Sequence, residues 1–168
     1  AASDVYKRQV MTRREDISIH DDSAKTIRQK KISDLHNRLK LINETPDCLF
    51  ISIHQNSYPY PNNTGTQVFY SPNHPESQAL AAAIQQSVIH LIQPQNTRKV
   101  KKSGTEIYLL YQAKTPAVMV ECGFMSNAQE TEKLRTEAYQ NELALSIFYG
   151  VLSYLNGIGT ADATPAAQ

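Results

Sequence analysis

The chain has 168 residues, with 17 Lys and Arg against 16 Asp and Glu, so its net charge is +1 with neutral histidines. This length suits one domain with a buried core, and a content of 40% apolar and 20% charged residues argues against disorder or a polyelectrolyte tail. Because the chain has no long basic block, nothing points to nucleic acid or an anionic membrane as a partner. Its apolar runs fall far short of the ~20 residues that cross a bilayer.

The two cysteines, Cys48 and Cys122, are too few for a disulfide framework and lack the paired spacing of a thiolate zinc site. The first nine residues contain no apolar segment of the kind found in a signal peptide. This absence is informative only if Ala1 is the true beginning of the protein.

The first half of the chain predicts a helix between two strand segments. Val10–Arg13 has the composition of a strand that ends in a loop. Within Ala24–Asn43, apolar residues form one helical stripe, so we expect a surface helix with one side packed on a core. Cys48–His54 is almost entirely apolar, which predicts a strand covered on both faces.

The second half alternates strands and helices. We expect strands at Thr66–Tyr70, Glu106–Leu110 and Ala117–Glu121, and helices from Pro75 to about Pro94, after Gly123–Asn127, and over Glu137–Leu155. Together these elements predict an α/β fold, with a mostly parallel or mixed sheet between helix layers.

Two of the expected strands end in an ionisable side chain, His54 and Glu121. The carboxyl ends of parallel strands form the ligand crevice of an open α/β sheet, so both side chains are expected at one edge. Taken singly, each has a plainer interpretation. Glu121 would simply reach water, and His54 would bond to a backbone carbonyl.

The sequence motifs around these two residues are more specific than the residues themselves. S-I-H-Q-N-S at Ser52–Ser57 and P-A-V-M-V-E-C-G-F-M-S-N at Pro116–Asn127 occur in this order. The chain resembles the zinc-dependent N-acetylmuramoyl-L-alanine amidases of the bacterial cell wall. Within that family it is most similar to the germination-specific amidases of spore-cortex peptidoglycan. That narrower likeness includes V-M-T-R, S-D-L-H-N-R-L-K-L-I-N, N-T-G-T-Q and N-T-R-K, and the likeness as a whole covers Val10 to about Leu155.

The resemblance implies a reaction and a role for each matching residue. His54 would be a zinc ligand and Glu121 the general base. A zinc-activated water would hydrolyse the amide between N-acetylmuramic acid and L-alanine in peptidoglycan. The site of action would be outside the cytoplasm, in the cell wall or the forespore intermembrane space. A signal or anchor is then expected ahead of the domain. The resemblance does not identify an activating protein.

Two further residues are candidates for substrate binding, and each also has a purely structural interpretation. Asn56 would orient substrate, or only end its strand. Arg98 would bind a peptide carboxylate, or remain a solvated charge in a basic loop. Cys122 is expected to pack rather than react. The remaining histidines match no family ligand and are expected to be solvated: His20, His36, His74 and His90.

The family takes its other two zinc ligands, a His and a Glu, from a segment that precedes V-M-T-R, and this chain contains neither. We therefore expect a domain over residues 10–156 that lacks the first strand and helix of the family fold, with a disordered tail at 157–168. Asp4–Gln9 reads as the translation of a transposase end sequence used to tag DNA fragments, so residues 1–9 are interpreted as an artefact.

With one ligand of three, the 168-residue chain itself is expected neither to bind zinc tightly nor to hydrolyse peptidoglycan. Two other classes of protein stay open. One is a non-catalytic peptidoglycan-binding or regulatory module, and the other is a zinc peptidase on a related scaffold. Sequencing the source DNA across the codons for Gln9 and Val10 would separate the first from the amidase.

Overall fold

The computed structural model describes residues 9–157, which form two compact units that meet at Pro46 and Asp47. The expected artefactual segment lies outside the described residues except for Gln9, and so does the expected tail except for Gly157. The first unit holds α1 (Ile27–Glu44). The second holds β1 (Phe50–Asn56), β2 (Gln67–Tyr70), α2 (Ser77–Leu91), β3 (Lys101–Lys102), α3 (Tyr108–Gln112), β4 (Ala117–Phe124), α4 (Ala128–Leu134) and α5 (Glu137–Leu155).

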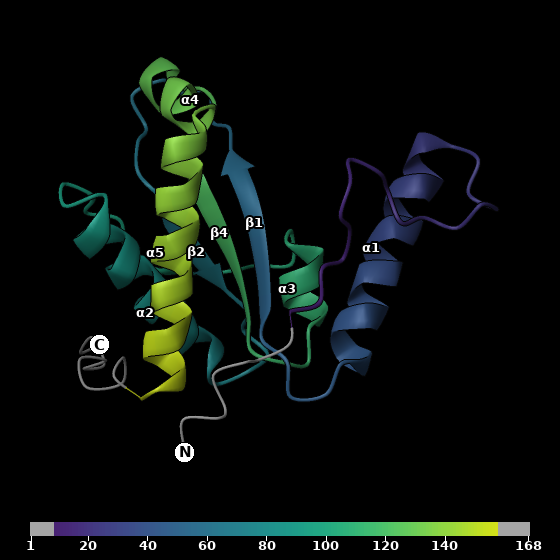
Figure 1. Cartoon of the computed structure of the whole chain (residues 1–168). Coiled ribbons are helices and arrows are strands. Elements are labelled where there is room, and N and C mark those ends of the chain that lie inside the picture. The colour runs from purple at the N-terminus through teal and green to yellow at the C-terminus, as the bar shows by residue number, and fades with distance from the viewer. Residues whose placement is uncertain (1–8, 158–168) are drawn as a thin grey trace. The chain divides into compact units, whose positions relative to one another are not determined.

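The second unit is built on a mixed sheet with the strand order β1-β4-β2-β3, which confirms the predicted α/β class. Figure 1 shows β1, β4 and β2 side by side. β4 is parallel to β1 and antiparallel to β2, and β3 is parallel to β2. β1 and β4 therefore end at the same edge, where β2 begins. This edge brings together the end of two strands and the loop that precedes a third.

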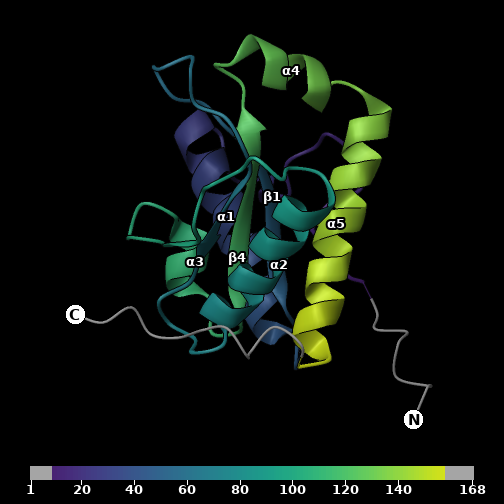
Figure 2. The same ribbon diagram turned by 90° about the vertical axis from the view of Figure 1, so that its left-hand side faces the viewer.

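Helices α2 and α5 lie side by side on one face of the sheet (Figure 2). The side chains that meet them from β4 are Val118, Val120 and Cys122, and all are buried. Since side chains alternate along a strand, Met119 and Glu121 belong to the opposite face. The apolar core and the candidate site thus occupy opposite faces of the same strand.

Three expectations about the elements are wrong. β1 is not covered on both faces, because it is the edge strand and Ile53 is 59% exposed. The apolar part of Glu106–Leu110 is helical and becomes α3, while the third strand lies in the preceding basic loop at Lys101–Lys102. Within the described residues, Val10–Arg13 has no strand partner and does not form a strand.

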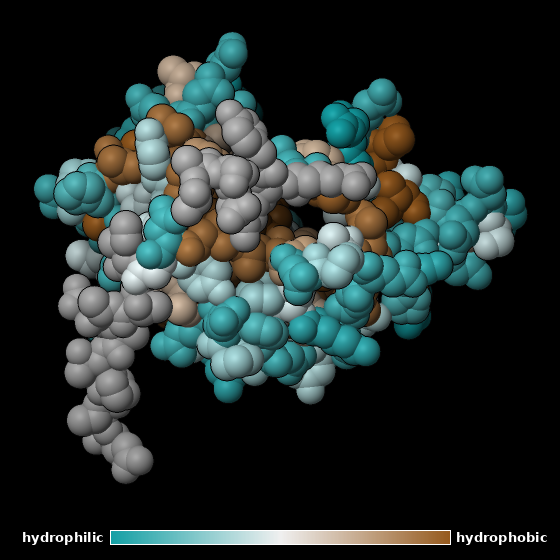
Figure 3. Space-filling model, turned by 60° about the horizontal axis from the view of Figure 1, so that its bottom comes forward, coloured by the Kyte–Doolittle hydropathy of each residue, from teal (hydrophilic) through white to brown (hydrophobic). Residues whose placement is uncertain are grey.

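Apolar side chains also reach the surface, as the brown areas among hydrophilic ones in Figure 3 show. Several of the exposed large ones belong to α5, namely Leu145, Phe148, Tyr149 and Leu155. Among residues 9–157, no helix combines the length and the hydropathy that a membrane span requires.

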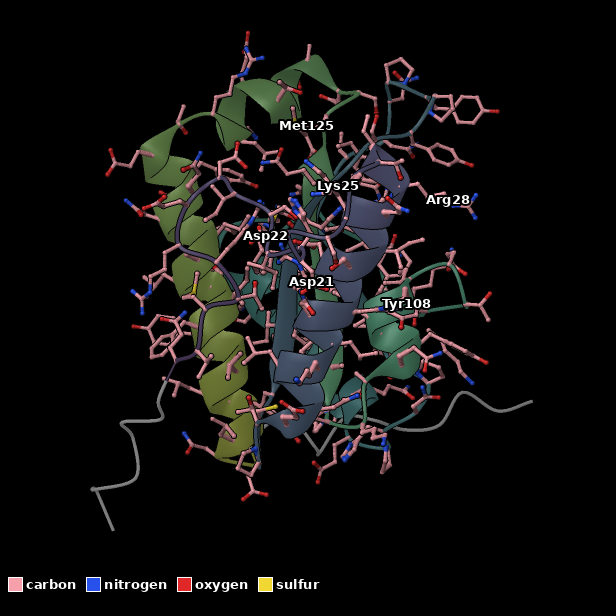
Figure 4. All side chains as sticks on the ribbon, turned by 90° about the vertical axis from the view of Figure 1, so that its right-hand side faces the viewer. Asp21, Asp22, Lys25, Arg28, Tyr108 and Met125 are labelled. Atoms are coloured by element: carbon pink, nitrogen blue, oxygen red, sulfur yellow. The ribbon has the colours of Figure 1, made fainter. Side chains whose placement is uncertain are left out.

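The first unit is held by polar contacts. Thr26 and Gln29 form a capping box at the start of α1, with the Thr26 side chain accepting from the Gln29 backbone N–H and the Gln29 side chain accepting from the Thr26 N–H. Asp21, Asp22 and Lys25 lie in the segment before the helix, and Arg28 lies in its first turn (Figure 4). Of the apolar stripe expected on this helix, Ile42 is buried and Ile27 is 88% exposed.

Asp34 is the main anchor of this segment. Its carboxylate accepts from the Ile19 N–H at 2.8 Å, from Ser18 Oγ at 2.9 Å and from Arg38 Nε at 2.6 Å. The Arg38 guanidinium and these donors lower the pKa of Asp34 to about 2. The charged form is therefore the form that holds residues 18–19 against the helix.

Lowering the pH is expected to release this anchor. A carboxyl group with a depressed pKa stabilises the folded state above its ordinary pKa of 3.8, and that contribution is lost as the pH falls toward about 2. Asp34→Asn should imitate the acid state at neutral pH. Amide hydrogen exchange at Ile19 measures both effects, and unchanged protection in the variant would contradict the assignment.

Candidate active site

His54 and Glu121 are paired neighbours at the edge where β1 and β4 end. His54 Nδ1 lies 3.3 Å from each of the two Glu121 carboxylate oxygens. Because directly paired residues of adjacent strands share a face, both side chains stand on the face opposite α2 and α5. The structure thus brings together the two residues that the sequence placed at one edge.

The two side chains differ sharply in exposure. The Glu121 side chain is 8% exposed, whereas the His54 side chain is 60% exposed. Burial raises the pKa of Glu121, and the neighbouring His54 opposes that change. The plainer interpretation of Glu121 as a strand-end carboxylate in water therefore fails, and so does that of His54 as a partner of a backbone carbonyl.

Cys122 points away from this pair. It is buried in the core beneath α2 and α5, and burial raises the pKa of its thiol to about 11. A thiol with so high a pKa is a poor nucleophile at neutral pH. The expectation that Cys122 packs is confirmed.

A β-bulge follows the pair. His54 pairs with Glu121, but Asn56 pairs with Phe124, so β4 has one extra residue at this point. Because of the bulge, the Phe124 side chain lies on the same face of the sheet as those of Asn56 and His54. The Asn56 carbonyl accepts from the Met125 N–H at 2.7 Å, which fixes the end of β1 to the residue after β4.

Arg98 lies above Phe124, with its guanidinium carbon 4.5 Å from the ring centroid. Its Nε donates to the Thr64 carbonyl at 2.6 Å, and Nη1 donates to Gln67 Oε1 at 3.4 Å. Gln67 is the partner of Glu121 across β2 and β4. Arg98 is therefore held at the edge of the candidate site rather than being free in a solvated loop.

The loop before β2 is fixed by half-buried side-chain amides. The Thr66 N–H donates to Gln93 Oε1 at 2.9 Å, and the Thr66 carbonyl accepts from Asn96 Nδ2 at 2.8 Å. Gly65 has a φ of +88°, and a Cβ on it would lie 2.9 Å from Asn96 Cγ. Glycine at this position is required both by the backbone and by the close approach of Asn96.

Glu130 on α4 joins three segments and is not among the site residues predicted from the sequence. Its carboxylate accepts from the Gly65 N–H at 2.6 Å and from the Phe124 N–H at 2.7 Å. Asn127 caps the same helix by accepting from the Glu130 N–H and donates to the Pro61 carbonyl. The pattern Asn-x-x-Glu resembles a helix-start signature and could have pointed to Glu130.

Glu130→Gln is expected to destabilise the protein by about 1–3 kcal/mol. The glutamine oxygen can still accept from one of the two backbone N–H groups, but its NH₂ would face the other, which then has no acceptor. Glu132→Gln, on an exposed position of the same helix, is the matched control and should change the unfolding free energy by less than about 0.5 kcal/mol. Urea denaturation measures both. Equal effects of the two substitutions would contradict the role given to Glu130.

The donor chemistry at this edge suits zinc only in part. An exposed imidazole next to a carboxylate is a common ligand arrangement, and His54 provides it. A catalytic zinc takes about three protein ligands, however, and within residues 9–157 no three His, Cys, Asp or Glu side chains cluster to hold a metal. The described residues therefore include a side chain that is able to bind zinc, His54, but they do not form a three-ligand cluster.

The other histidines lie elsewhere. His36 and His90 are exposed, as expected, whereas His20 and His74 are half-buried, so the expectation that all four are solvated is wrong for these two. His74 Nδ1 accepts from the Glu76 N–H at 3.3 Å, in the turn that begins α2.

The second unit carries a buried carboxylate and a histidine in contact at the carboxyl edge of its sheet, which is where α/β folds bind their ligands. The model of the N-acetylmuramoyl-L-alanine amidase family matches residues 3–153, and the chain belongs to this family. This confirms the resemblance carried by the two motifs.

Individual relatives agree with the family. The chain is 35% identical to the germination-specific N-acetylmuramoyl-L-alanine amidase of Bacillus subtilis over 150 residues, which cover 89% of this chain and 62% of that protein. It is 35% identical to the CwlD amidase of Clostridioides difficile, solved in complex with the GerS lipoprotein, with a TM-score of 0.84 over 88% of this chain and 75% of that one. An N-acetylmuramoyl-L-alanine amidase from Clostridium difficile 630 is 30% identical, with a TM-score of 0.66 over 73% and 65% of the two chains.

Proposed function

We propose that this chain belongs to a peptidoglycan hydrolase that cleaves the amide bond between N-acetylmuramic acid and L-alanine. The observation that carries the proposal is the buried Glu121 carboxylate in contact with exposed His54, at the edge where substrate binds in this class of fold. Family membership gives the reaction class. Since the chain spans 62% of the length of its Bacillus subtilis relative, the activity of the whole protein is part of the proposal.

Glu121 is proposed as the general base. Its carboxylate takes a proton from the water that attacks the lactyl carbonyl, and it then gives a proton to the amine of the departing L-alanine. Burial keeps the carboxylate away from bulk water, and the contact with His54 holds it on the site face. Asn56 and Arg98 are proposed to orient substrate beside it, with Arg98 using guanidinium N–H groups beyond those that fix the loop.

His54 is proposed as one ligand of a catalytic zinc. When bound, such an ion lowers the pKa of a coordinated water and polarises the carbonyl. Because the described residues do not complete a site, we expect the 168-residue chain to show no one-equivalent zinc site of sub-micromolar affinity. Zinc titration of the purified chain tests this, and a tight stoichiometric site would contradict it.

The second candidate function is a peptidoglycan-binding or regulatory module without catalysis. The incomplete metal cluster favours it. The presence of both His54 and Glu121, in contact with each other, favours the amidase over the binding module, because a binding module has no need of a buried carboxylate.

The proposed place of action is outside the cytoplasm, where peptidoglycan lies, with a role in spore germination taken from the Bacillus subtilis relative. A protein partner is proposed from CwlD, which was solved with the GerS lipoprotein.

Mapping the cleaved bond tests the proposal. Muropeptides are incubated with the 168-residue chain and with the longest polypeptide encoded by its gene, and the products are identified by mass spectrometry. We expect the longer polypeptide to release peptides that begin with L-alanine. Products cut within the peptide would indicate a peptidase, and binding without cleavage by either polypeptide would support the module.

A further inference from the structure

The site face of the sheet carries positive charge on one side of Glu121. β3 is paired with β2 so that Lys101 lies opposite Phe69 and Lys102 lies opposite Tyr70. Tyr70 packs on the core beneath α2 and α5, whereas Lys101 Nζ lies 5.6 Å from the centroid of the Phe69 ring. The two consecutive lysines therefore face opposite sides of the sheet, and only Lys101 shares the face of Glu121.

Lys101 is available to an incoming anion. It is exposed, and within residues 9–157 no carboxylate lies within 4.0 Å of its amine. Its stacking on Phe69 holds the flexible stem over the sheet, which is a favourable cation–π arrangement. The amine is thus positioned by the protein but its charge is not neutralised there.

The spacing to Glu121 can be derived from the sheet. Glu121 pairs with Gln67, and Lys101 pairs with Phe69, two residues further along β2. Two strand spacings across and two residues along separate the two Cα atoms by about 12 Å. The Lys101 amine is nearer than its Cα, because it lies at the Phe69 ring, one strand spacing and two residues from Glu121, which is about 8 Å along the sheet. Because both side chains rise from the same face, a substrate cleaved at Glu121 and extended toward β3 would meet this amine about two residues from the scissile bond, at roughly 3.5 Å for each extended residue.

We propose that Lys101 is a specificity-determining residue that binds a free carboxylate of the stem peptide, one residue beyond the L-alanine. The inference rests on the proposed amidase function and deepens it. This contact also sets the direction in which the substrate lies on the sheet. The stem peptide carries the negative charge, and the positive charge of Lys101 lies on the β3 side of Glu121. The peptide then runs across β2 toward β3, and the glycan lies toward β1.

The test compares two soluble ligands that differ by one charge, N-acetylmuramyl-L-alanyl-D-glutamate and the corresponding D-isoglutamine amide. Binding to the 168-residue chain is measured by NMR titration at low salt. We expect the acid to bind about three- to fivefold more tightly than the amide, the size of a solvent-exposed charge contact. Lys101→Gln should abolish this preference, and Lys101→Arg should retain it.

Lys102→Gln is the matched control, because it removes the same charge from the next residue on the opposite face. It should leave the preference intact. A preference that survives Lys101→Gln, or that is lost equally in both variants, would overturn the assignment. If the wild-type chain binds both ligands equally, or binds neither, the role of Lys101 fails, whereas the proposed function is overturned only by the mapping of the cleaved bond.

Discussion

Replacing Glu121 with Gln is expected to lower the rate of muropeptide hydrolysis at least about 100-fold in any form of the protein that hydrolyses them. A glutamine keeps the shape of the side chain but cannot take the proton of the attacking water, and general acid–base catalysis contributes about 10²–10⁴-fold. The measurement is the initial rate of release of L-alanine-linked peptides from purified peptidoglycan.

Stability distinguishes this result from a folding defect. Burial makes the charged form of Glu121 costly, so Glu121→Gln is expected to leave the free energy of unfolding unchanged or to raise it. Glu132→Gln, on the exposed side of α4, controls for the loss of one negative charge and should retain full activity. An active Glu121→Gln variant would remove this residue from the mechanism.

Replacing Gly150 with Ala is expected to destabilise the protein by about 2–3 kcal/mol. In this position a Cβ would lie 2.5 Å from Ile84 Cα and 2.9 Å from the Ala83 carbonyl oxygen, both of them backbone atoms of α2. A backbone cannot rotate away as a side chain does, so α2 and α5 would have to separate. The sign is diagnostic, because the same change in an exposed helix stabilises it by about 1 kcal/mol.

The control is a larger substitution at an exposed position of the same helix. Ala144→Leu should change the unfolding free energy by less than about 0.5 kcal/mol, because Ala144 is exposed. Urea or thermal denaturation measures both variants. A Gly150→Ala protein as stable as the wild type would show that α2 and α5 do not pack as closely as the structure places them.

The sequence predicted the central pair because its signals are local. His54 and Glu121 each end a strand whose composition is visible in a few residues, and parallel strands that end together share an edge. Their contact required only that β1 and β4 be neighbours, which the sheet confirms. Long elements with clear periodicity, such as α5, were also predicted at the bounds that the structure has.

Other parts could not be predicted because they depend on tertiary position. Cys48–His54 is apolar enough for a central strand, but its exposure is decided by its place at the sheet edge. The strand at Lys101–Lys102 has no apolar pattern and exists only through its pairing with β2. The position of Arg98 depends on the bulge that brings Phe124 beneath it, and no spacing in the sequence reveals that bulge.

The most direct test of the proposed reaction is hydrolysis in H₂¹⁸O by the longest polypeptide encoded by the gene, with products analysed by mass spectrometry. Water added at the muramyl amide places ¹⁸O in the lactyl carboxylate of N-acetylmuramic acid and leaves the released peptide unlabelled at its carboxyl groups. That result is predicted for wild type, with at least about 100-fold less labelled product from Glu121→Gln in the same time. Label in a peptide carboxylate, or equal labelling by the variant, would contradict the account.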